Sequence, residues 1–174
     1  MKLIFLIGMP LSGKTYWAVK LSEAYHIPFI DTDAVIRGLK NKTVAQIFET
    51  EGERVFRQLE HELLMEIIST TDEAMIVACG GGMPVFYDNI NIMKKTGCTV
   101  YLKTNVVTLV QRLESIEEQN SRPLLAGIVD LEEELEILLE ERKYIYEQAD
   151  YVIDAANVSV SSFGQIIQSC TGRH

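Results

Sequence analysis

"GMPLSGKT", residues 8–15, has the form G-x-x-x-x-G-K-T and directly follows the apolar run "LIFLI" at residues 3–7. A segment with helical periodicity begins at about residue 14. A strand, a glycine-rich loop and a helix in this order are the context in which the motif binds phosphate groups. Backbone N–H groups of the loop and the positive end of the helix hold those phosphates. The stretch therefore predicts a nucleotide-binding loop in an α/β fold.

Two side chains of the loop have the chemistry that phosphoryl transfer requires. We expect Lys14 to reach the β- and γ-phosphates of a nucleotide and the Thr15 hydroxyl to ligate Mg²⁺. A purely structural loop is the alternative, and the flanking strand and helix argue against it. The other predicted nucleotide contacts come from the loop and the first residues of the helix: Leu11, Ser12, Gly13 and Tyr16.

Apolar runs and helical segments alternate along the rest of the chain. Continuous apolar strands that alternate with helices indicate a parallel sheet covered on both faces. No repeat or linker interrupts the pattern, and the length suits one domain spanning residues 1–174. We expect strands at 3–7, 28–31, 74–78, 99–103 and 151–154, and helices at about 14–25, 51–69, 84–95, 105–114 and 131–149, followed by the segment "SVSSFGQIIQSC".

The charge and the first residues exclude two classes of partner. The net charge is −9, from 16 basic and 25 acidic residues, and no basic run offers a stripe for nucleic acid. The start of the chain has no small-residue cleavage site, and Lys14 follows too soon for a membrane span. We expect a protein that binds neither nucleic acid nor membrane, and we take a monomer as the starting expectation.

The cysteines and histidines show no metal-binding pattern. Cys79, Cys98 and Cys170 are odd in number and form no C-x-x-C motif. The simplest interpretation is a reduced chain in the cytoplasm. The three histidines lack the spacing of metal ligands, so the sequence predicts no zinc site.

Two more polar or glycine-rich motifs follow predicted strands. "DTD" at residues 31–33 ends the second strand, and "CGGG" at residues 79–82 follows the third. Ligands of parallel sheets bind outside the carboxyl ends of the strands, so we expect both motifs beside the phosphate loop. Asp31 and Asp33 on an extended segment would point the same way, one toward the metal's water shell and one toward a substrate hydroxyl. The alternative is that Asp31 or Thr32 only caps the next helix.

Three consecutive glycines, Gly80, Gly81 and Gly82, need a physical reason because glycine loses more backbone entropy on folding than other residues. One interpretation is a tight turn from strand to helix that requires positive φ. The other is a floor on which a ligand lies against the bare backbone. The position of the glycines at the same edge as the phosphate loop favours the second.

Charged side chains occupy core-facing positions of two predicted helices. In residues 51–68, Glu60 falls on the apolar stripe and Arg57 lies one turn before it, so the two can pair. The pair is either purely structural or part of a binding site. In residues 131–149, Arg142 falls on the stripe of leucines, where an unpaired guanidinium is costly. A substrate carboxylate would match its planar fork.

Residues 114–127, "ESIEEQNSRPLLAG", form a polar segment between two predicted helices, and Arg122 is its only cation. A loop of this length is usually functional, which predicts a mobile lid. The alternative is a surface loop without a role in the reaction.

With "GKT", "DTD", "GERVFRQLE", "CGGG", "SRPLLAG" and "ERKYIYEQAD" in this order, the chain resembles the shikimate kinase family over about residues 1–167. The resemblance implies a P-loop kinase fold similar to that of nucleoside monophosphate kinases, with a five-stranded parallel sheet and a closing lid. It also implies transfer of the γ-phosphoryl of ATP to the 3-hydroxyl of shikimate, with Mg²⁺, on the route to aromatic amino acids. A helical region at about 32–62 would bind the substrate.

The family's site residues map onto matching positions of this sequence. The resemblance implies that Asp33, Arg57, Gly81 and Arg142 bind shikimate, with Gly80, Gly82 and Glu60 beside them and Phe48 and Phe56 against the ring. Arg122 would reach the phosphates from the lid, Arg112 would lie against the adenine, and Asp31 would approach Mg²⁺ through water. Lys14, Asp33 and Arg122 are the expected catalytic residues.

The sequence departs from the family at a few positions. Glycine is usual where Leu11 stands, and a β-carbon there would constrain a turn that needs positive φ. The family has a small residue where Trp17 or Ala18 begins the helix, and an arginine after the last strand is absent from "DAANVSV". The rival hypotheses are a nucleoside monophosphate kinase, whose lid generally carries several arginines, and a non-catalytic relative that only binds ligands.

Overall fold

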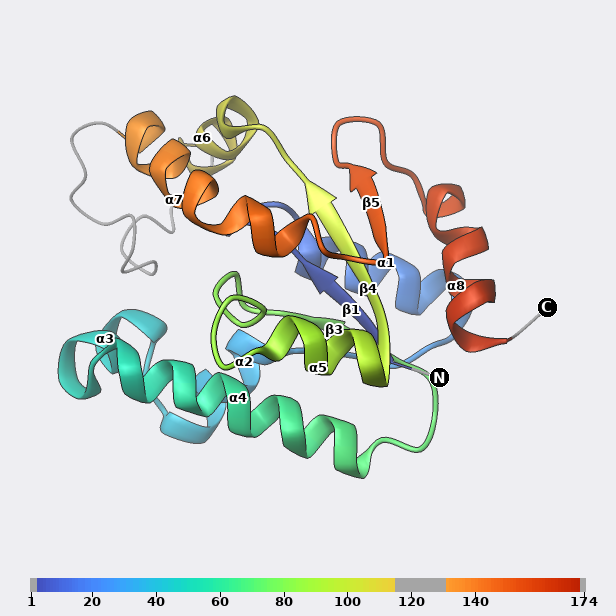
Figure 1. Cartoon of the computed structure of the whole chain (residues 1–174), viewed down its shortest axis with the longest axis horizontal. Coiled ribbons are helices and arrows are strands. Elements are labelled where there is room, and N and C mark those ends of the chain that lie inside the picture. The colour runs from blue at the N-terminus through green and yellow to red at the C-terminus, as the bar shows by residue number, and fades with distance from the viewer. Residues whose placement is uncertain (1–2, 115–130, 173–174) are drawn as a thin grey trace.

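A parallel sheet of five strands forms the centre of the computed structural model, which describes residues 3–114 and 131–172 (Figure 1). The strand order is β2-β3-β1-β4-β5, and every neighbouring pair is parallel. The strands are β1 (Leu3–Ile7), β2 (Phe29–Asp31), β3 (Met75–Ala78), β4 (Gly97–Lys103) and β5 (Tyr151–Asp154). The predicted α/β fold with a five-stranded parallel sheet is confirmed.

Helices follow the strands and cover both faces of the sheet (Figure 1). Residues 32–51, which the sequence assigned only to a helical region, form two short helices. The helices are α1 (Lys14–Tyr25), α2 (Thr32–Lys40), α3 (Val44–Glu51), α4 (Glu53–Thr70), α5 (Asn89–Thr96), α6 (Val106–Glu114), α7 (Leu131–Tyr146) and α8 (Gly164–Thr171), with a short 3₁₀ turn at Val160–Phe163.

Side chains of β1 alternate between two cores, as a sheet covered on both faces requires. Leu3, Phe5 and Ile7 pack with residues of α4, α5, α6 and α7. Ile4 and Leu6 pack on the other face with residues of α1 and α8. All five side chains are buried, which explains the continuous apolar run.

The helix predicted to begin near residue 84 begins only at Asn89. Residues 83–88 instead form a series of turns, in which Tyr87 and Asp88 have φ of 55° and 61°. Left-handed backbone cannot continue a right-handed helix, so α5 starts after these two residues. The apolar side chains of this segment therefore belong to a loop beside the glycine triplet.

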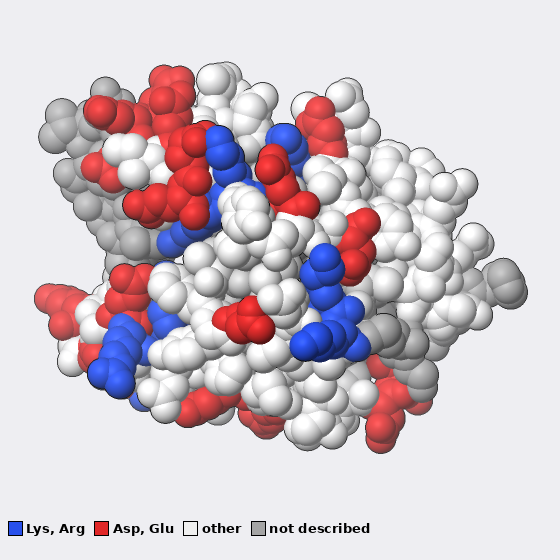
Figure 2. Space-filling view, viewed as in Figure 1, with Lys and Arg blue, Asp and Glu red and all other residues white. Residues whose placement is uncertain are grey.

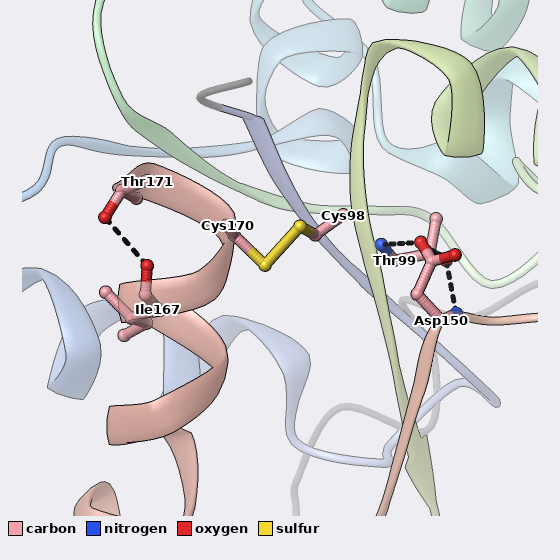
Figure 3. Close-up of a disulfide and its surroundings, with 6 residues drawn as sticks. All are labelled: Cys98, Thr99, Asp150, Ile167, Cys170 and Thr171. Carbon is pink, nitrogen blue, oxygen red and sulfur yellow. Dashed lines mark hydrogen bonds between the residues drawn. A yellow bond between two sulfur atoms is a disulfide. The ribbon is translucent and has the colours of Figure 1, made fainter. Parts of the chain in front are cut away.

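A disulfide joins Cys98 in β4 to Cys170 in α8 (Figure 3). The prediction of a fully reduced chain is therefore wrong for this pair, and Cys79 is the free cysteine. The two partners are 72 residues apart, so their spacing gave no indication of the bond. It anchors the last helix to the strand beside β1.

Acidic side chains gather over α7 on the face shown in Figure 2, where Glu132, Glu133 and Glu134 occupy the first turn. These glutamates are exposed, which matches their interpretation as a solvated helix face. None of the helices in the described ranges is long and apolar enough to cross a membrane.

Candidate functional site

A cavity of about 730 Å³ opens at the carboxyl ends of the strands, where the topology brings three predicted motifs together. Its lining includes most of the residues predicted to bind ligands: Leu11, Gly13, Lys14, Thr15, Tyr16, Asp31, Asp33, Phe48, Phe56, Arg57, Glu60, Gly81, Gly82, Arg112 and Arg142. The phosphate loop forms part of the cavity wall, and charged residues of α2, α4 and α7 form another part.

The phosphate loop wraps around the side chain of Lys14. Its Nζ donates hydrogen bonds to the carbonyls of Gly8 (3.0 Å) and Met9 (2.7 Å) and to Oγ of Ser12 (3.3 Å). Gly13 has a φ of 93°, which glycine adopts at low cost immediately before α1. The loop thus presents its backbone N–H groups and Lys14 at the start of the helix, as the motif predicts.

Leu11 adopts the left-handed conformation that a β-carbon disfavours, with a φ of 66°. Two contacts hold it there. Its side chain is buried in the core shared with α4 and α7, and its carbonyl accepts a 2.8 Å hydrogen bond from Nη1 of Arg112. Arg112 of α6 therefore lies against the phosphate loop, on the wall of the cavity.

The Asp31 carboxylate makes two hydrogen bonds, one of which is the helix cap that the sequence offered as the alternative role. Its Oδ1 accepts from the N–H of Ala34 (2.9 Å), so it caps α2, and its Oδ2 accepts from the Thr15 hydroxyl (2.5 Å). The extended segment expected for residues 31–33 is wrong for Asp33, which lies in the first turn of α2. Both carboxylates nevertheless line the cavity, because the strand ends there and the helix begins.

The glycine triplet leaves room for functional side chains. A β-carbon on Gly80 would lie 2.5 Å from Oδ1 of Asp33 and from Oε1 of Glu60, and one on Gly82 would lie 2.2 Å from Nη1 of Arg57. None of the three has positive φ, so the tight-turn interpretation is wrong. Close approach is the reason for the glycines: a carboxylate pair approaches Gly80, Pro10 approaches Gly81 and a guanidinium approaches Gly82.

Thr32 is a residue that the sequence analysis assigned only a possible capping role. Its hydroxyl accepts a 2.8 Å hydrogen bond from the N–H of Gly80 and lies 3.4 Å from the Ala78 carbonyl. It therefore fixes the glycine triplet relative to α2. Gly80 and Ser12 are not among the residues that line the cavity, and Ser12 is fully buried within the phosphate loop.

Arg57 and Glu60 form the buried ion pair that their spacing predicts. Nη1 of Arg57 donates to Oε2 of Glu60 at 2.7 Å, and the two side chains are 4% and 1% exposed. Nε and Nη2 of Arg57 donate to Oε1 of Glu53 at 3.1 and 2.9 Å. Oε1 of Glu60 has no hydrogen-bond partner among the described residues, which leaves a buried acceptor beside Asp33.

Burial shifts the acid–base properties of this pair. Desolvation raises the pKa of Glu60 to about 7 even though the Arg57 guanidinium opposes the shift. Desolvation also disfavours the charge of Arg57, but the carboxylates of Glu60 and Glu53 outweigh it and raise its pKa. Arg57 is therefore a permanent cation beside the cavity.

Arg142 of α7 contributes a second buried cation to the same wall. Its side chain is buried, and Nη1 has no hydrogen-bond partner in the described part of the chain. Tyr146, one turn later on α7, donates a 2.7 Å hydrogen bond to the Gly81 carbonyl and so fixes the helix against the glycine triplet. A buried guanidinium with an open donor suits a bound anion.

The cavity also has lining residues to which the sequence analysis gave no ligand-binding role, either because they were only neighbours within a motif or because the fold alone brings them there. They are Pro10, Trp17, Arg37, Val44, Cys79, Ala155 and Val158. Beyond its first residue, the predicted lid at 114–127, with Arg122, lies outside the described residues.

The sheet order and the phosphate loop define a nucleotide-binding fold with a P-loop. The family described as shikimate kinase matches residues 10–171, so the protein is an ATP-dependent small-molecule kinase. The chain belongs to the shikimate kinase family.

Individual relatives agree with this assignment. Shikimate kinase of Parabacteroides distasonis is 37% identical over 166 residues, which are 93% of this chain and 92% of that protein. The structure of shikimate kinase from Acinetobacter baumannii in complex with shikimate is 33% identical, with a TM-score of 0.85 over 97% of this chain and 92% of that one. The structure of shikimate kinase from Bacteroides thetaiotaomicron is 35% identical, with a TM-score of 0.83 over 97% of both chains.

Proposed function

We propose that the cavity binds shikimate at its charged end and ATP at the phosphate loop, and that the protein transfers the γ-phosphoryl group to the 3-hydroxyl of shikimate. The observation that carries this proposal is the pair of buried arginines, Arg57 and Arg142, on the wall of a cavity that also contains the loop. Two guanidiniums match a carboxylate, which shikimate carries and uncharged sugars lack. The substrate carboxylate would take up the open Nη1 donor of Arg142.

The hydroxyl groups of shikimate would contact carboxyl groups rather than arginines. Asp33 and Glu60 bring carboxyl oxygens together over Gly80, and Oε1 of Glu60 is an acceptor without a described partner. Hydroxyl donors satisfy such acceptors at little cost. Asp33 would orient the attacking hydroxyl or remove its proton. Gly81, Gly82, Phe48 and Phe56 would contact the carbocycle, with Gly80 behind them.

The nucleotide would lie along the phosphate loop and α1. Lys14 would exchange its carbonyl contacts for phosphate oxygens, and Leu11, Ser12, Gly13 and Tyr16 would supply backbone and side-chain contacts. Arg112 would lie beside the adenine while holding the Leu11 carbonyl. Arg122 remains a proposed catalytic residue of the lid.

Mg²⁺ fits the oxygen donors at the rim. The Thr15 hydroxyl and the Asp31 carboxylate lie 2.5 Å apart, and Mg²⁺ prefers a few protein oxygens together with water and phosphate oxygens. Thr15 would bind the ion directly and Asp31 through water. When bound, the ion would neutralise charge on the transferring phosphoryl group.

The test is ADP release measured with shikimate, gluconate and nucleoside monophosphates as separate acceptors. We expect Mg²⁺-dependent turnover with shikimate alone. Turnover only with a nucleoside monophosphate would indicate a nucleotide kinase. ATP binding without turnover on any acceptor would indicate a non-catalytic binding protein.

We also propose that the protein works in the cytoplasm as a monomer, with small molecules as its only partners. Support for the location is the use of ATP, and the acidic surface over α7 argues against nucleic acid. In a reducing cytoplasm Cys98 and Cys170 would be thiols, and the disulfide would form only under oxidising conditions. Sedimentation equilibrium tests the monomer, and thiol titration of the protein from freshly lysed cells tests the reduced state.

A further inference from the structure

Three aromatic rings surround the guanidinium of Arg57. Its Cζ lies 5.5 Å from the ring centroid of Phe48, 5.4 Å from that of Phe56 and 4.7 Å from that of Phe86. Phe48 and Phe56 line the cavity, and the resemblance to the family already assigns them to the substrate. Phe86 comes from the loop after the glycine triplet and lies outside the set of residues that line the cavity.

The loop that carries Phe86 is fixed to the helix that carries Arg57. Asn89 is fully buried, and its Nδ2 donates a 2.8 Å hydrogen bond to the Met83 carbonyl. Its Oδ1 lies 2.7 Å from Nδ1 of His61, which follows Arg57 by one turn on α4. The His61 ring also packs on Tyr87, with centroids 5.3 Å apart. The loop and α4 are therefore linked at two points next to Arg57.

The backbone of the loop adopts an unfavourable conformation to make this link. Tyr87 and Asp88 both have positive φ although both carry a β-carbon. Local hydrogen bonds maintain the turn: the N–H of Asn89 donates to the Phe86 carbonyl (3.0 Å), and Nδ2 of Asn91 donates to Oδ1 of Asp88 (2.6 Å). The turn reverses the chain immediately after Phe86 and leaves its ring against Arg57.

An aromatic ring attracts a guanidinium without taking up its N–H donors. Nε, Nη1 and Nη2 of Arg57 each donate one hydrogen bond to Glu53 or Glu60, whereas a guanidinium carries five donors. The ring face of Phe86 stabilises the cation through its quadrupole and leaves the remaining donors for an anion. The Cβ position of Gly82, which lines the cavity, would fall against these nitrogens, so the guanidinium lies at the cavity wall.

We propose that Phe86 is a positioning residue that sets the affinity for shikimate by holding the Arg57 guanidinium in place for the substrate carboxylate. This proposal rests on the proposed role of Arg57 in binding that carboxylate. Phe86 acts through Arg57, so it should influence the binding of the acceptor and neither ATP binding nor the chemical step.

The experiment compares Phe86→Leu, which keeps an apolar side chain but loses the ring, with Phe86→Tyr, which keeps the ring. Phe86→Leu should raise the KM for shikimate about 3- to 30-fold, the range expected for a partly buried cation–π contact. Its kcat and its KM for ATP should stay near the wild-type values, and Phe86→Tyr should restore the KM for shikimate. Phe29→Leu is the matched control, because it makes the same change at a ring that is 40% exposed on β2 and is not among the three rings around Arg57.

Arg57→Lys distinguishes the proposed role of Phe86 from the assignment on which it rests, namely that Arg57 binds the substrate carboxylate. If Arg57→Lys leaves the KM for shikimate unchanged, the carboxylate assignment is wrong. If Arg57→Lys raises this KM but Phe86→Leu does not, only the role of Phe86 is refuted. An equal loss for shikimate and ATP, or a low melting temperature, would assign Phe86 to loop stability. In that case Phe86→Met, which also lacks the ring, is measured near 10 °C, where a destabilised variant stays folded. A normal KM for shikimate in the folded Phe86→Met variant would also refute the proposal.

Discussion

The hydroxyl of Thr15 donates a 2.5 Å hydrogen bond to Oδ2 of Asp31, which joins the end of the phosphate loop to the end of β2. Oδ1 of the same carboxylate caps α2 through the N–H of Ala34. One side chain therefore connects the proposed magnesium site with the start of the helix that carries Asp33.

The two roles of Asp31 can be separated by substitution. Asparagine caps helices as well as aspartate does, whereas alanine does not. Asp31→Asn should keep the melting temperature but raise the Mg²⁺ concentration for half-maximal activity about 10-fold, because the charge that holds the metal's water is lost. Asp31→Ala should show the same requirement and also lose about 0.5–2 kcal/mol of stability. An unchanged Mg²⁺ requirement in Asp31→Asn would leave only the capping role.

Removal of the Lys14 ammonium should abolish most of the turnover. Phosphoryl transfer depends on positioned charge, and loss of one preorganised donor typically costs about 10²–10³-fold in kcat. Lys14→Ala should reach at least that loss, measured as ADP release at saturating ATP and shikimate. Lys20→Ala on the exposed side of α1 is the matched control, since its ion pair with Glu23 is 3.9 Å long and exposed. A near-normal rate in Lys14→Ala would exclude the loop as the phosphate site.

Arg142 should contribute mainly to the binding of shikimate. A charge-assisted hydrogen bond is worth about 1.5–3 kcal/mol, so Arg142→Ala should raise the KM for shikimate about 10- to 150-fold. The carboxylate is bound equally in the ground and transition states, so kcat should change little. Lys143→Ala is the control, because Lys143 is an exposed neighbour that contacts Glu140. A loss of kcat without a change in KM would place Arg142 at the phosphoryl group instead.

The sequence predicted the fold and most of the residues that line the cavity, because both follow from local patterns. The apolar run at residues 3–7 predicts the central strand, and the loop after it predicts the nucleotide-binding part of the cavity. Helical periodicity identifies Glu60 and Arg142 as charged residues on buried faces of their helices. These arguments need only residue order. The predicted roles of Lys14, Arg57 and Arg142 await the substitutions described above.

The features that the sequence did not reveal depend on contacts between distant segments. The late start of α5 follows from positive φ at Tyr87 and Asp88; only the aspartate is a common turn residue, and the helical periodicity of the neighbouring residues outweighed that single signal. The contact of Phe86 with Arg57 crosses from that loop to α4. The Cys98–Cys170 bond joins positions that only the completed sheet and the last helix bring together.

The disulfide should stabilise the oxidised protein. It closes a long stretch of chain, and cross-links of this kind typically contribute about 2–4 kcal/mol. The double substitution Cys98→Ser and Cys170→Ser should lower the free energy of unfolding by that amount in urea titrations. A thiol reductant should destabilise the wild type equally and leave the double variant unchanged. Equal stability of the wild type with and without reductant would mean that packing of α8 suffices.

Glu60 should make stability depend on pH. Burial raises its pKa in the folded state to about 7 from the ordinary value of 4.5, so the folded state favours the protonated carboxyl. This contribution is fully present below about pH 4.5 and is lost as the pH rises through 7. Glu60→Gln has no proton to lose, so its free energy of unfolding should increase relative to wild type between pH 5 and pH 8. The change is measured by urea titration at several pH values.

Glu53→Gln is the matched control for this comparison, because Glu53 contacts the same guanidinium but its side chain is 51% exposed. Loss of such an exposed partner should cost less than about 1 kcal/mol. The other titrating groups are common to all three proteins, so their effects cancel in the differences. A constant difference between Glu60→Gln and wild type from pH 5 to pH 8 would show that Glu60 titrates outside this range. The buried acceptor proposed for the shikimate hydroxyls would then be a permanent carboxylate held by Arg57.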